Sequence, residues 1–194
     1  MHRIALSIVL AVTLGAPAAG PAVDMPLKAG VLSPAKPAPE LKLAGTDGKP
    51  LNLARFRGRV VLLAFGFSHC PEVCPTTLST LASARKKLGA DAADVQVVYV
   101  TVDPERDNAA QMRKFLGSFD PTFIGGVGTR AEIDAAQKSY GVSSTKKVFA
   151  SGGYGIAHSS SVYMIDRAGR LAAVMPYGHT VADFVHDLKI LLRG

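Results

Sequence analysis

The sequence predicts an α/β fold in which a central sheet is flanked by helices, and three observations support this. Two continuous apolar runs, Val60 to Phe67 and Val95 to Val102, are rich in branched residues and too short for lone helices, which is typical of strands buried on both faces. Segments with apolar residues at helical spacing alternate with these runs. A hairpin pattern and an amphipathic segment close the chain, so sheet and helices share one core.

Composition and charge exclude several other classes of protein. With 48% hydrophobic and 19% charged residues over 194 positions, the chain is globular and is neither collagen-like nor a coiled coil. The net charge is +7, but the basic residues occur in ones and twos, only 7% of residues are aromatic, and there is no tryptophan. Because nucleic-acid surfaces need a basic stripe or a stacking platform, no nucleic-acid partner is expected.

The N-terminus indicates export. Arg3 precedes the apolar segment Ile4 to Leu14, and small residues follow at 16–20, which is the pattern of a secretory signal with a cleavage site. We therefore assign residues 1–20 to a signal peptide or N-terminal anchor. Cleavage is favoured, because glycines and prolines interrupt the apolar stretch before it reaches the ~20 residues of a membrane span.

Residues 21–39 are predicted to form a proline-rich tether. They contain five prolines, at positions 21, 26, 34, 37 and 39, and proline-rich segments favour an extended conformation without a core of their own. The folded domain is then expected over residues 40–194, which is an ordinary size for one domain.

The elements of this domain follow from local patterns. Leucines at 41–43 and 51–53 flank the turn Thr46-Asp47-Gly48-Lys49 and indicate an N-terminal hairpin. After the first buried strand, Thr76 to Leu88 has helical apolar spacing and three basic residues in its last turn, which suit a helix C-terminus.

The remaining elements complete an alternating order. We expect helices over Asn108–Leu116 and Arg130–Tyr140, a hairpin with strands at 161–165 and 171–175, and a final amphipathic helix over Val181–Leu192. Gly141 is expected to stop the second of these helices. The order fits a thioredoxin-like topology, in which the chemistry lies where the first buried strand passes to its helix.

The only two cysteines, Cys70 and Cys74, lie at that position. Pro75 favours the start of a helix and restricts the residue before it, so Cys74 is predicted to be the helix cap and Cys70 to lie in the preceding loop. Thiolates are favoured at the positive end of a helix, and the thiolate is the form that binds metals and attacks disulfides.

Three roles for the cysteine pair are open from spacing alone. A structural disulfide is common in exported proteins, but a bridge that closes so short a loop constrains little of the unfolded chain. A redox pair needs no further residue. A metal site needs at least a third ligand, and sulfur with imidazole suits copper or zinc.

One histidine is a candidate for that third ligand. His158 follows the glycine-rich segment 151–157, predicted to be a loop that can carry it toward the strand-helix junction. His69 adjoins Cys70, but neighbouring side chains in an extended chain point to opposite sides. His179 and His186 are expected at the surface.

Three sequence blocks resemble the signature of the SCO/SenC family. They are the segments Phe67–Leu78, with the motif CPEVCP, Val102–Asp107, and His158–Asp166, with HSSSVYMID. The resemblance covers nearly the whole domain from residue 40. It implies a thioredoxin-like fold with a hairpin inserted before the C-terminal helix, and a protein exported to the periplasm or to the outer face of the inner membrane.

The resemblance also implies a function. The family carries copper toward the binuclear copper centre of cytochrome c oxidase, and its ligands correspond to Cys70, Cys74 and His158. Asp103 corresponds to an acidic residue near that site. The expected cargo is Cu(I), with Cu(II) on the same residues, and the expected partners are the copper subunit of the oxidase or another cuproprotein, a copper donor protein and a thiol reductant. The alternative is an exported thiol-disulfide oxidoreductase that reduces the cysteines of the acceptor. Thioredoxin-type reductases use a C-x-x-C spacing, whereas Cys70 and Cys74 are separated by three residues.

Two positions depart from the family pattern. Ala157 stands where the family often has aspartate, which removes an acidic neighbour of the histidine. Asn108-Ala109 stands where Thr-Pro is common, which alters only a helix start. Neither departure affects an expected ligand.

Overall fold

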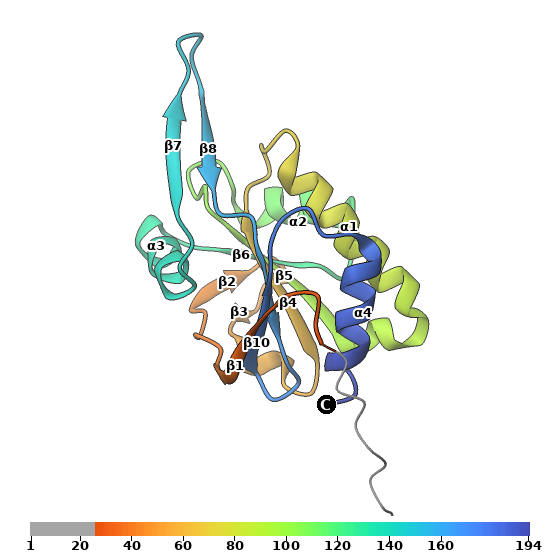
Figure 1. The fold of residues 1–194 in the computed structure, drawn as a ribbon. Coiled ribbons are helices and arrows are strands. Elements are labelled where there is room, and N and C mark those ends of the chain that lie inside the picture. Colours follow the sequence, from red (N-terminus) through yellow and green to blue (C-terminus); the bar gives the residue numbers. More distant parts are fainter. Residues whose placement is uncertain (1–25) are drawn as a thin grey trace, which may run out of the picture.

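The computed structural model describes residues 26–194 of the chain, so the predicted signal peptide or anchor over residues 1–20 lies outside the described residues. Strands and helices alternate around one central sheet (Figure 1). No helix within residues 26–194 is long and apolar enough to cross a membrane.

The central sheet contains eight strands in the order β1-β10-β9-β4-β5-β6-β2-β3. Their bounds are β1 Gly30–Pro37, β2 Leu43–Gly45, β3 Pro50–Leu51, β4 Val60–Gly66, β5 Val95–Thr101, β6 Ile124–Val127, β9 Val162–Ile165 and β10 Arg170–Met175. Strands β4, β5 and β6 are parallel, and the other pairs are antiparallel. The predicted α/β class, the N-terminal hairpin and both buried strands are confirmed.

Helices cover both faces of this sheet. They are α1 Val73–Leu88, α2 Ala109–Gly117, α3 Arg130–Ser139 and α4 Val181–Leu191, with 3-10 turns η1 Leu53–Phe56 and η2 Gly89–Asp94. Helices α1, α2 and α4 lie on one side of the sheet and α3 on the other (Figure 1). The predicted stop of α3 is confirmed, because Gly141 follows the helix with a φ of 66°, in the left-handed region that glycine adopts without strain.

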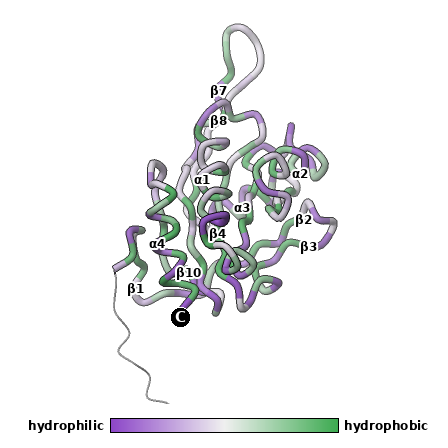
Figure 2. The backbone as a smooth tube through the Cα atoms, turned by 90° about the vertical axis from the view of Figure 1, so that its right-hand side faces the viewer, coloured by the Kyte–Doolittle hydropathy of each residue, from purple (hydrophilic) through white to green (hydrophobic). Residues whose placement is uncertain are grey.

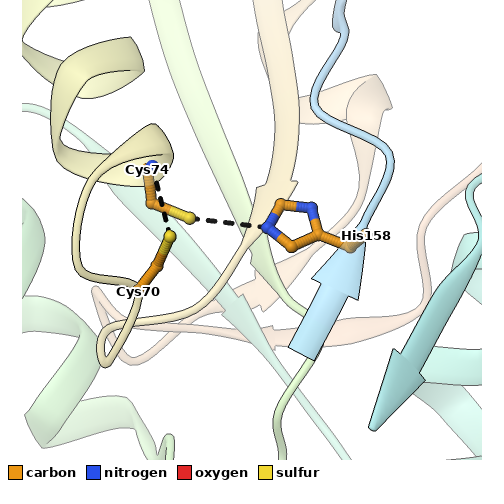
Figure 3. Close-up of side chains that lie close together, drawn as sticks. All are labelled: Cys70, Cys74 and His158. Carbon is orange, nitrogen blue, oxygen red and sulfur yellow. Dashed lines mark hydrogen bonds between the residues drawn. The ribbon is translucent and has the colours of Figure 1, made fainter. Parts of the chain in front are cut away.

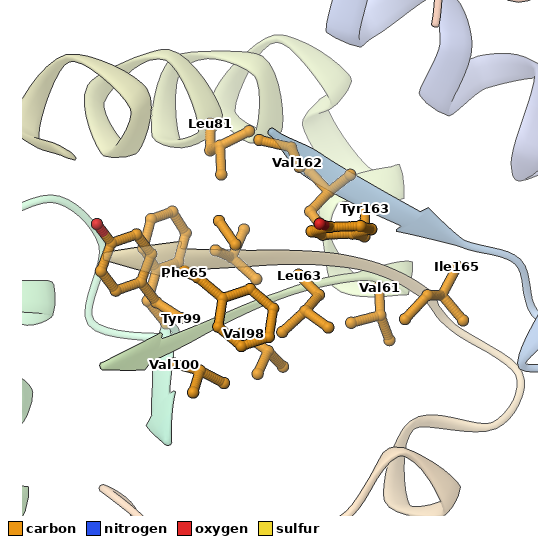
Figure 4. Packing of buried hydrophobic residues seen from close by; sticks show 14 of the residues in the cluster. Val61, Leu63, Phe65, Leu81, Val98, Tyr99, Val100, Val162, Tyr163 and Ile165 are labelled. Atoms are coloured by element: carbon orange, nitrogen blue, oxygen red, sulfur yellow. The ribbon is translucent and has the colours of Figure 1, made fainter. Parts of the chain in front are cut away.

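The core lies on both sides of β4 and β5, every residue of which is buried. On one side Phe65 contacts the rings of Tyr140 and Tyr163, with centroid distances of 5.7 and 6.1 Å. On the opposite side Tyr99 faces α1, which contributes Leu81 (Figure 4). Each large apolar side chain buried in this way contributes about 1.5–3 kcal/mol, so the strand that leads to the cysteines is anchored in a close-packed core.

The expected tether is wrong over part of its length. Gly30–Pro37 forms β1, which pairs with β10 at the edge of the sheet. Proline is tolerated on an edge strand because one side of that strand needs no partner. Just before β1, the backbone N–H groups of Lys28 and Ala29 donate to the buried carboxylate of Asp187 on α4, at 2.8 and 2.9 Å.

The start of α1 also differs from the prediction. The helix begins at Val73, with Glu72 as its N-cap, so Cys74 is the second helical residue and not the cap. Pro75 takes the third position, where its missing N–H costs nothing because the first four N–H groups of a helix have no partner within it.

The segment before His158 is a strand and not the predicted glycine-rich loop. Strands β7 Ser144–Val148 and β8 Tyr154–His158 form a separate two-stranded hairpin, and His158 is the last residue of β8. Both Figure 1 and Figure 2 show this hairpin projecting beyond the rest of the molecule. The fold therefore has two hairpins late in the chain: β7–β8, which projects, and β9–β10, which belongs to the central sheet.

Candidate metal centre

Three side chains from separate elements meet at the end of β4. Cys70 comes from the loop after the strand, Cys74 from the first turn of α1 and His158 from the end of β8 (Figure 3). The two sulfurs and one ring nitrogen all lie within 4.8 Å of one another. The Cys74 Sγ is 3.5 Å from the His158 Nε2, and the Cys74 N–H donates to the Cys70 Sγ at 3.5 Å. Two soft sulfur atoms and an imidazole can hold one soft ion.

Cys74 is the buried member of the pair. Its side chain packs against the core, and only 2% of the residue is exposed. Burial raises the pKa of the Cys74 thiol to about 12, although a hydrogen bond with Tyr99 acts in the opposite direction. The expectation that the helix end would favour a thiolate is therefore wrong for Cys74 in the metal-free protein, because desolvation disfavours the charged form more strongly.

This difference between the cysteines predicts their order of reaction. At pH 7 iodoacetamide is expected to modify Cys70, which is partly exposed, and to leave Cys74 unmodified. Because burial raises the pKa of the Cys74 thiol to about 12, this cysteine is almost entirely protonated at that pH and reacts slowly. Peptide mass mapping of the reduced, metal-free protein measures this, and unfolded protein, in which both thiols react, is the control. Equal modification of both cysteines in the folded protein would contradict the prediction.

The ring of His158 is held in one tautomer. Its Nδ1 lies 2.7 Å from the carbonyl oxygen of Ser159, which can only accept, so Nδ1 carries the proton and Nε2 presents a lone pair toward the sulfurs. Burial lowers the pKa of His158, and the Ser159 carbonyl opposes this shift. The ring also packs edge-on against Phe67, with centroids 5.8 Å apart. The imidazole is thus neutral and oriented as a ligand before any ion arrives.

The other residues singled out in the sequence lie elsewhere. Asp103 is buried and, among residues 26–194, belongs to no group of three close ligand atoms; it accepts a hydrogen bond from Tyr154 on β8 at 2.8 Å. The His69 Nδ1 lies 3.0 Å from the Ser68 hydroxyl and 3.8 Å from the Asp107 carboxylate. His179 and His186 are partly buried beside Asp183 and Asp187.

Sequence reasoning did not single out Tyr99, which hydrogen-bonds with Cys74, or Tyr154, which donates to Asp103 from the strand that carries His158. Tyr99 lies in β5, which was predicted as a buried strand. A continuous apolar run does not reveal which of its residues faces a thiol. Tyr154 stands four residues before His158, an even spacing that places both on one face of a strand. That signal existed, but it has meaning only once the segment is known to be a strand.

A family model and a curated relative both match this chain, and both are named for SCO proteins. A sequence model of the SCO1/SenC family matches residues 32–193. "Protein SCO2 homolog, mitochondrial" from Mus musculus is 35% identical over 159 residues, covering 77% of this chain and 60% of the mouse protein. The chain thus spans about three fifths of that relative's length.

Solved structures agree with the sequence relatives. The structure of Bradyrhizobium japonicum ScoI with copper bound is 35% identical, with a TM-score of 0.74, covering 80% of this chain and 99% of that one. The solution structure of apo Sco1 from Thermus thermophilus is 33% identical, with a TM-score of 0.78, covering 88% and 100%. These likenesses confirm the thioredoxin-like fold, and the family match over residues 32–193 shows that this chain belongs to the SCO1/SenC family.

Proposed function

We propose that this protein binds Cu(I) through Cys70, Cys74 and His158 and delivers it to a copper centre of cytochrome c oxidase or to another cuproprotein. The observation that carries this proposal is the convergence of two free thiols and one oriented imidazole within 4.8 Å. The copper-bound ScoI structure, from a relative that is 35% identical, supports copper as the cargo. Cu(II) is proposed as a second cargo of the same residues.

The three proposed ligands differ in how deeply they are buried and in the elements that carry them. Cys74 is fixed on α1 and buried, while Cys70 lies in a partly exposed loop and His158 at the base of a projecting hairpin. Thiols of an acceptor can therefore displace the Cys70 and His158 ligands first, since the loop and the hairpin that carry them lie outside the central sheet. The Cys74 proton must leave when the ion binds, so binding is coupled to proton release. This role is transfer of cargo and not enzymatic turnover.

Several partners follow from this chemistry. Because an oxidised pair cannot bind the ion, a thiol reductant is proposed to act before loading, and a copper donor protein to supply the cargo. The signal-like residues 1–20 support a location in the periplasm or at the outer face of the inner membrane, with membrane association through that segment if it is retained.

The test compares copper binding with and without the thiols. Reduced full-length protein, titrated with Cu(I) in competition with a chromophoric chelator, is expected to bind one ion. The Cys70→Ser, Cys74→Ser double variant should bind at least about 100-fold more weakly, because it lacks both sulfur ligands. Circular dichroism confirms that both proteins are folded. If the wild type binds Cu(I) no more tightly than the double variant, the copper proposal is wrong.

A second candidate function is thiol-disulfide exchange with the cysteines of the acceptor. It is favoured by the proximity of the sulfurs of two free cysteines, one of them partly exposed. It uses the same sulfurs but does not need the imidazole. The effect of replacing His158 therefore separates the two functions.

A further inference from the structure

The hairpin that carries His158 is fastened to the body of the protein by a cluster around one aromatic ring. On β8 the side chains of Tyr154, Ile156 and His158 lie on the same face, because alternate residues of a strand point to the same side. Their register partners on β7 are Val148, Lys146 and Ser144. Ile156 on this face packs against the core, so the face of β8 that bears the imidazole is directed toward the body.

Two cations lie over the ring of Tyr154. The guanidinium carbon of Arg106, from the loop between β5 and α2, is 3.8 Å from the ring centroid. The ammonium nitrogen of Lys146, on β7, is also 3.8 Å from that centroid. Both distances are well within the ~6 Å at which a cation is attracted to the ring face. The ring therefore connects the hairpin to the loop that follows β5.

Hydrogen bonds and ion pairs fix the edges of the same cluster. The Tyr154 hydroxyl donates to the buried carboxylate of Asp103 at 2.8 Å, and Arg106 pairs with that carboxylate. Arg106 also donates to the backbone carbonyl of Tyr154 at 3.1 Å, and Lys146 pairs with Glu105 at 2.6 Å. The pair between Arg106 and Asp103 lies within the segment 103–106, and the other three contacts join that segment to the hairpin.

The cluster extends to the imidazole through a second ring. Arg106 lies 5.6 Å from the centroid of Phe67, and Phe67 packs edge-on against His158. The Nη2 atom of Arg106 is buried and has no hydrogen-bond partner among residues 26–194. The contacts of the Arg106 guanidinium with the rings of Phe67 and Tyr154 compensate for this missing hydrogen bond. Arg106 is therefore part of the packing between the hairpin and the body of the protein.

We propose that Tyr154 is a positioning residue for the metal ligand His158, acting through its contacts with Arg106, Lys146 and Asp103. The inference rests on the proposed copper function, since positioning matters only if the imidazole binds the ion. Tyr154 itself contributes no ligand atom to the group of three. When the ring is lost, His158 occupies its place beside Cys74 for a smaller fraction of the time, and the apparent dissociation constant rises in proportion.

Three variants of one side chain test this proposal. Tyr154→Ala is expected to weaken Cu(I) binding by about 10-fold to 100-fold, the range typical of residues that orient a ligand. Tyr154→Phe keeps the ring and loses only the hydroxyl, so it should recover most of the affinity. Tyr154→Leu keeps much of the apolar volume without the aromatic face, so it should behave more like alanine. Tyr177→Ala, which removes an exposed tyrosine, is the matched control and should bind like the wild type.

A readout without copper completes the test. In the metal-free protein, the amide protons of Tyr154–His158 should exchange faster in the alanine variant than in wild type, while those of β4 and β5 keep their protection. Unchanged affinity and unchanged exchange in Tyr154→Ala would overturn the positioning role. Failure of the wild type to exceed the double cysteine variant would overturn the copper function instead, and the exchange measurement would still decide whether Tyr154 holds the hairpin.

Discussion

Replacing His158 with alanine is expected to weaken Cu(I) binding by more than about 100-fold, because even residues that only orient a ligand cost about 10-fold to 100-fold. The imidazole presents Nε2 at 3.5 Å from the Cys74 sulfur and is already neutral and oriented, so its loss removes a prepared ligand. The two cysteines remain and should still form and exchange a disulfide. Chelator competition measures the first effect, and the rate of exchange with a small disulfide measures the second.

The same variant separates the two candidate functions in cells. A copper carrier without His158 should fail to support oxidase assembly, whereas a dedicated thiol reductase would retain its role. His69→Ala is the matched control: that histidine adjoins Cys70, but its ring lies against Ser68. Normal oxidase assembly in cells carrying only the His158→Ala protein would contradict copper delivery through this site.

Replacing Gly66 with alanine is expected to damage both the fold and the site. A Cβ at position 66 would lie 2.6 Å from the Tyr99 Cζ and 2.8 Å from the Cys74 Sγ, closer than real Cβ atoms approach other groups. Tyr99 is 1% exposed and enclosed by the core, so it cannot move aside cheaply. We expect a loss of about 3 kcal/mol in the free energy of unfolding, at the upper end of the range for overpacking.

Thermal and urea unfolding measure that loss, which corresponds to a decrease of roughly 10 °C in Tm for a domain of this size. Gly117→Ala is the matched control, because a Cβ there meets no atom within 4 Å, and its stability should be unchanged or slightly raised. Adding Tyr99→Phe to Gly66→Ala should recover part of the loss, since the hydroxyl is among the atoms that clash. A fully stable Gly66→Ala protein that binds copper normally would show that the contact between these groups is not needed.

The elements that could be predicted from sequence are those with a strong hydrophobic signal. The strands β4 and β5 are continuous apolar runs, and α2, α3 and α4 have helical spacing, so their positions were predicted to within about two residues. Strands β1 and β7 gave no such signal because most of their residues are exposed. Edge strands of this kind are held by backbone hydrogen bonds, which side-chain patterns do not reveal.

The candidate site could be predicted as a set of residues but not as an environment. The position of Cys70 and Cys74 after a buried strand located the chemistry, and the family resemblance selected His158. The register of β7 with β8, which brings His158 to the sulfurs, depends on contacts across the hairpin. The raised pKa of Cys74 depends on burial under the first turn of α1, and no local pattern predicts that burial.

The hydrogen bonds from the backbone of Lys28 and Ala29 to Asp187 attach the chain to the folded domain at this point. They limit the length of chain between the N-terminal segment and the domain. Between the small residues at 16–20 and this anchoring point lie only residues 21–27, a length of chain that spans at most about 25 Å even when fully extended. The described chain enters the domain at the end opposite the projecting hairpin (Figure 1). In a copy held in a bilayer by its first twenty residues, this short connection would keep the domain close to the membrane, with the connection and the projecting hairpin at opposite ends of the domain.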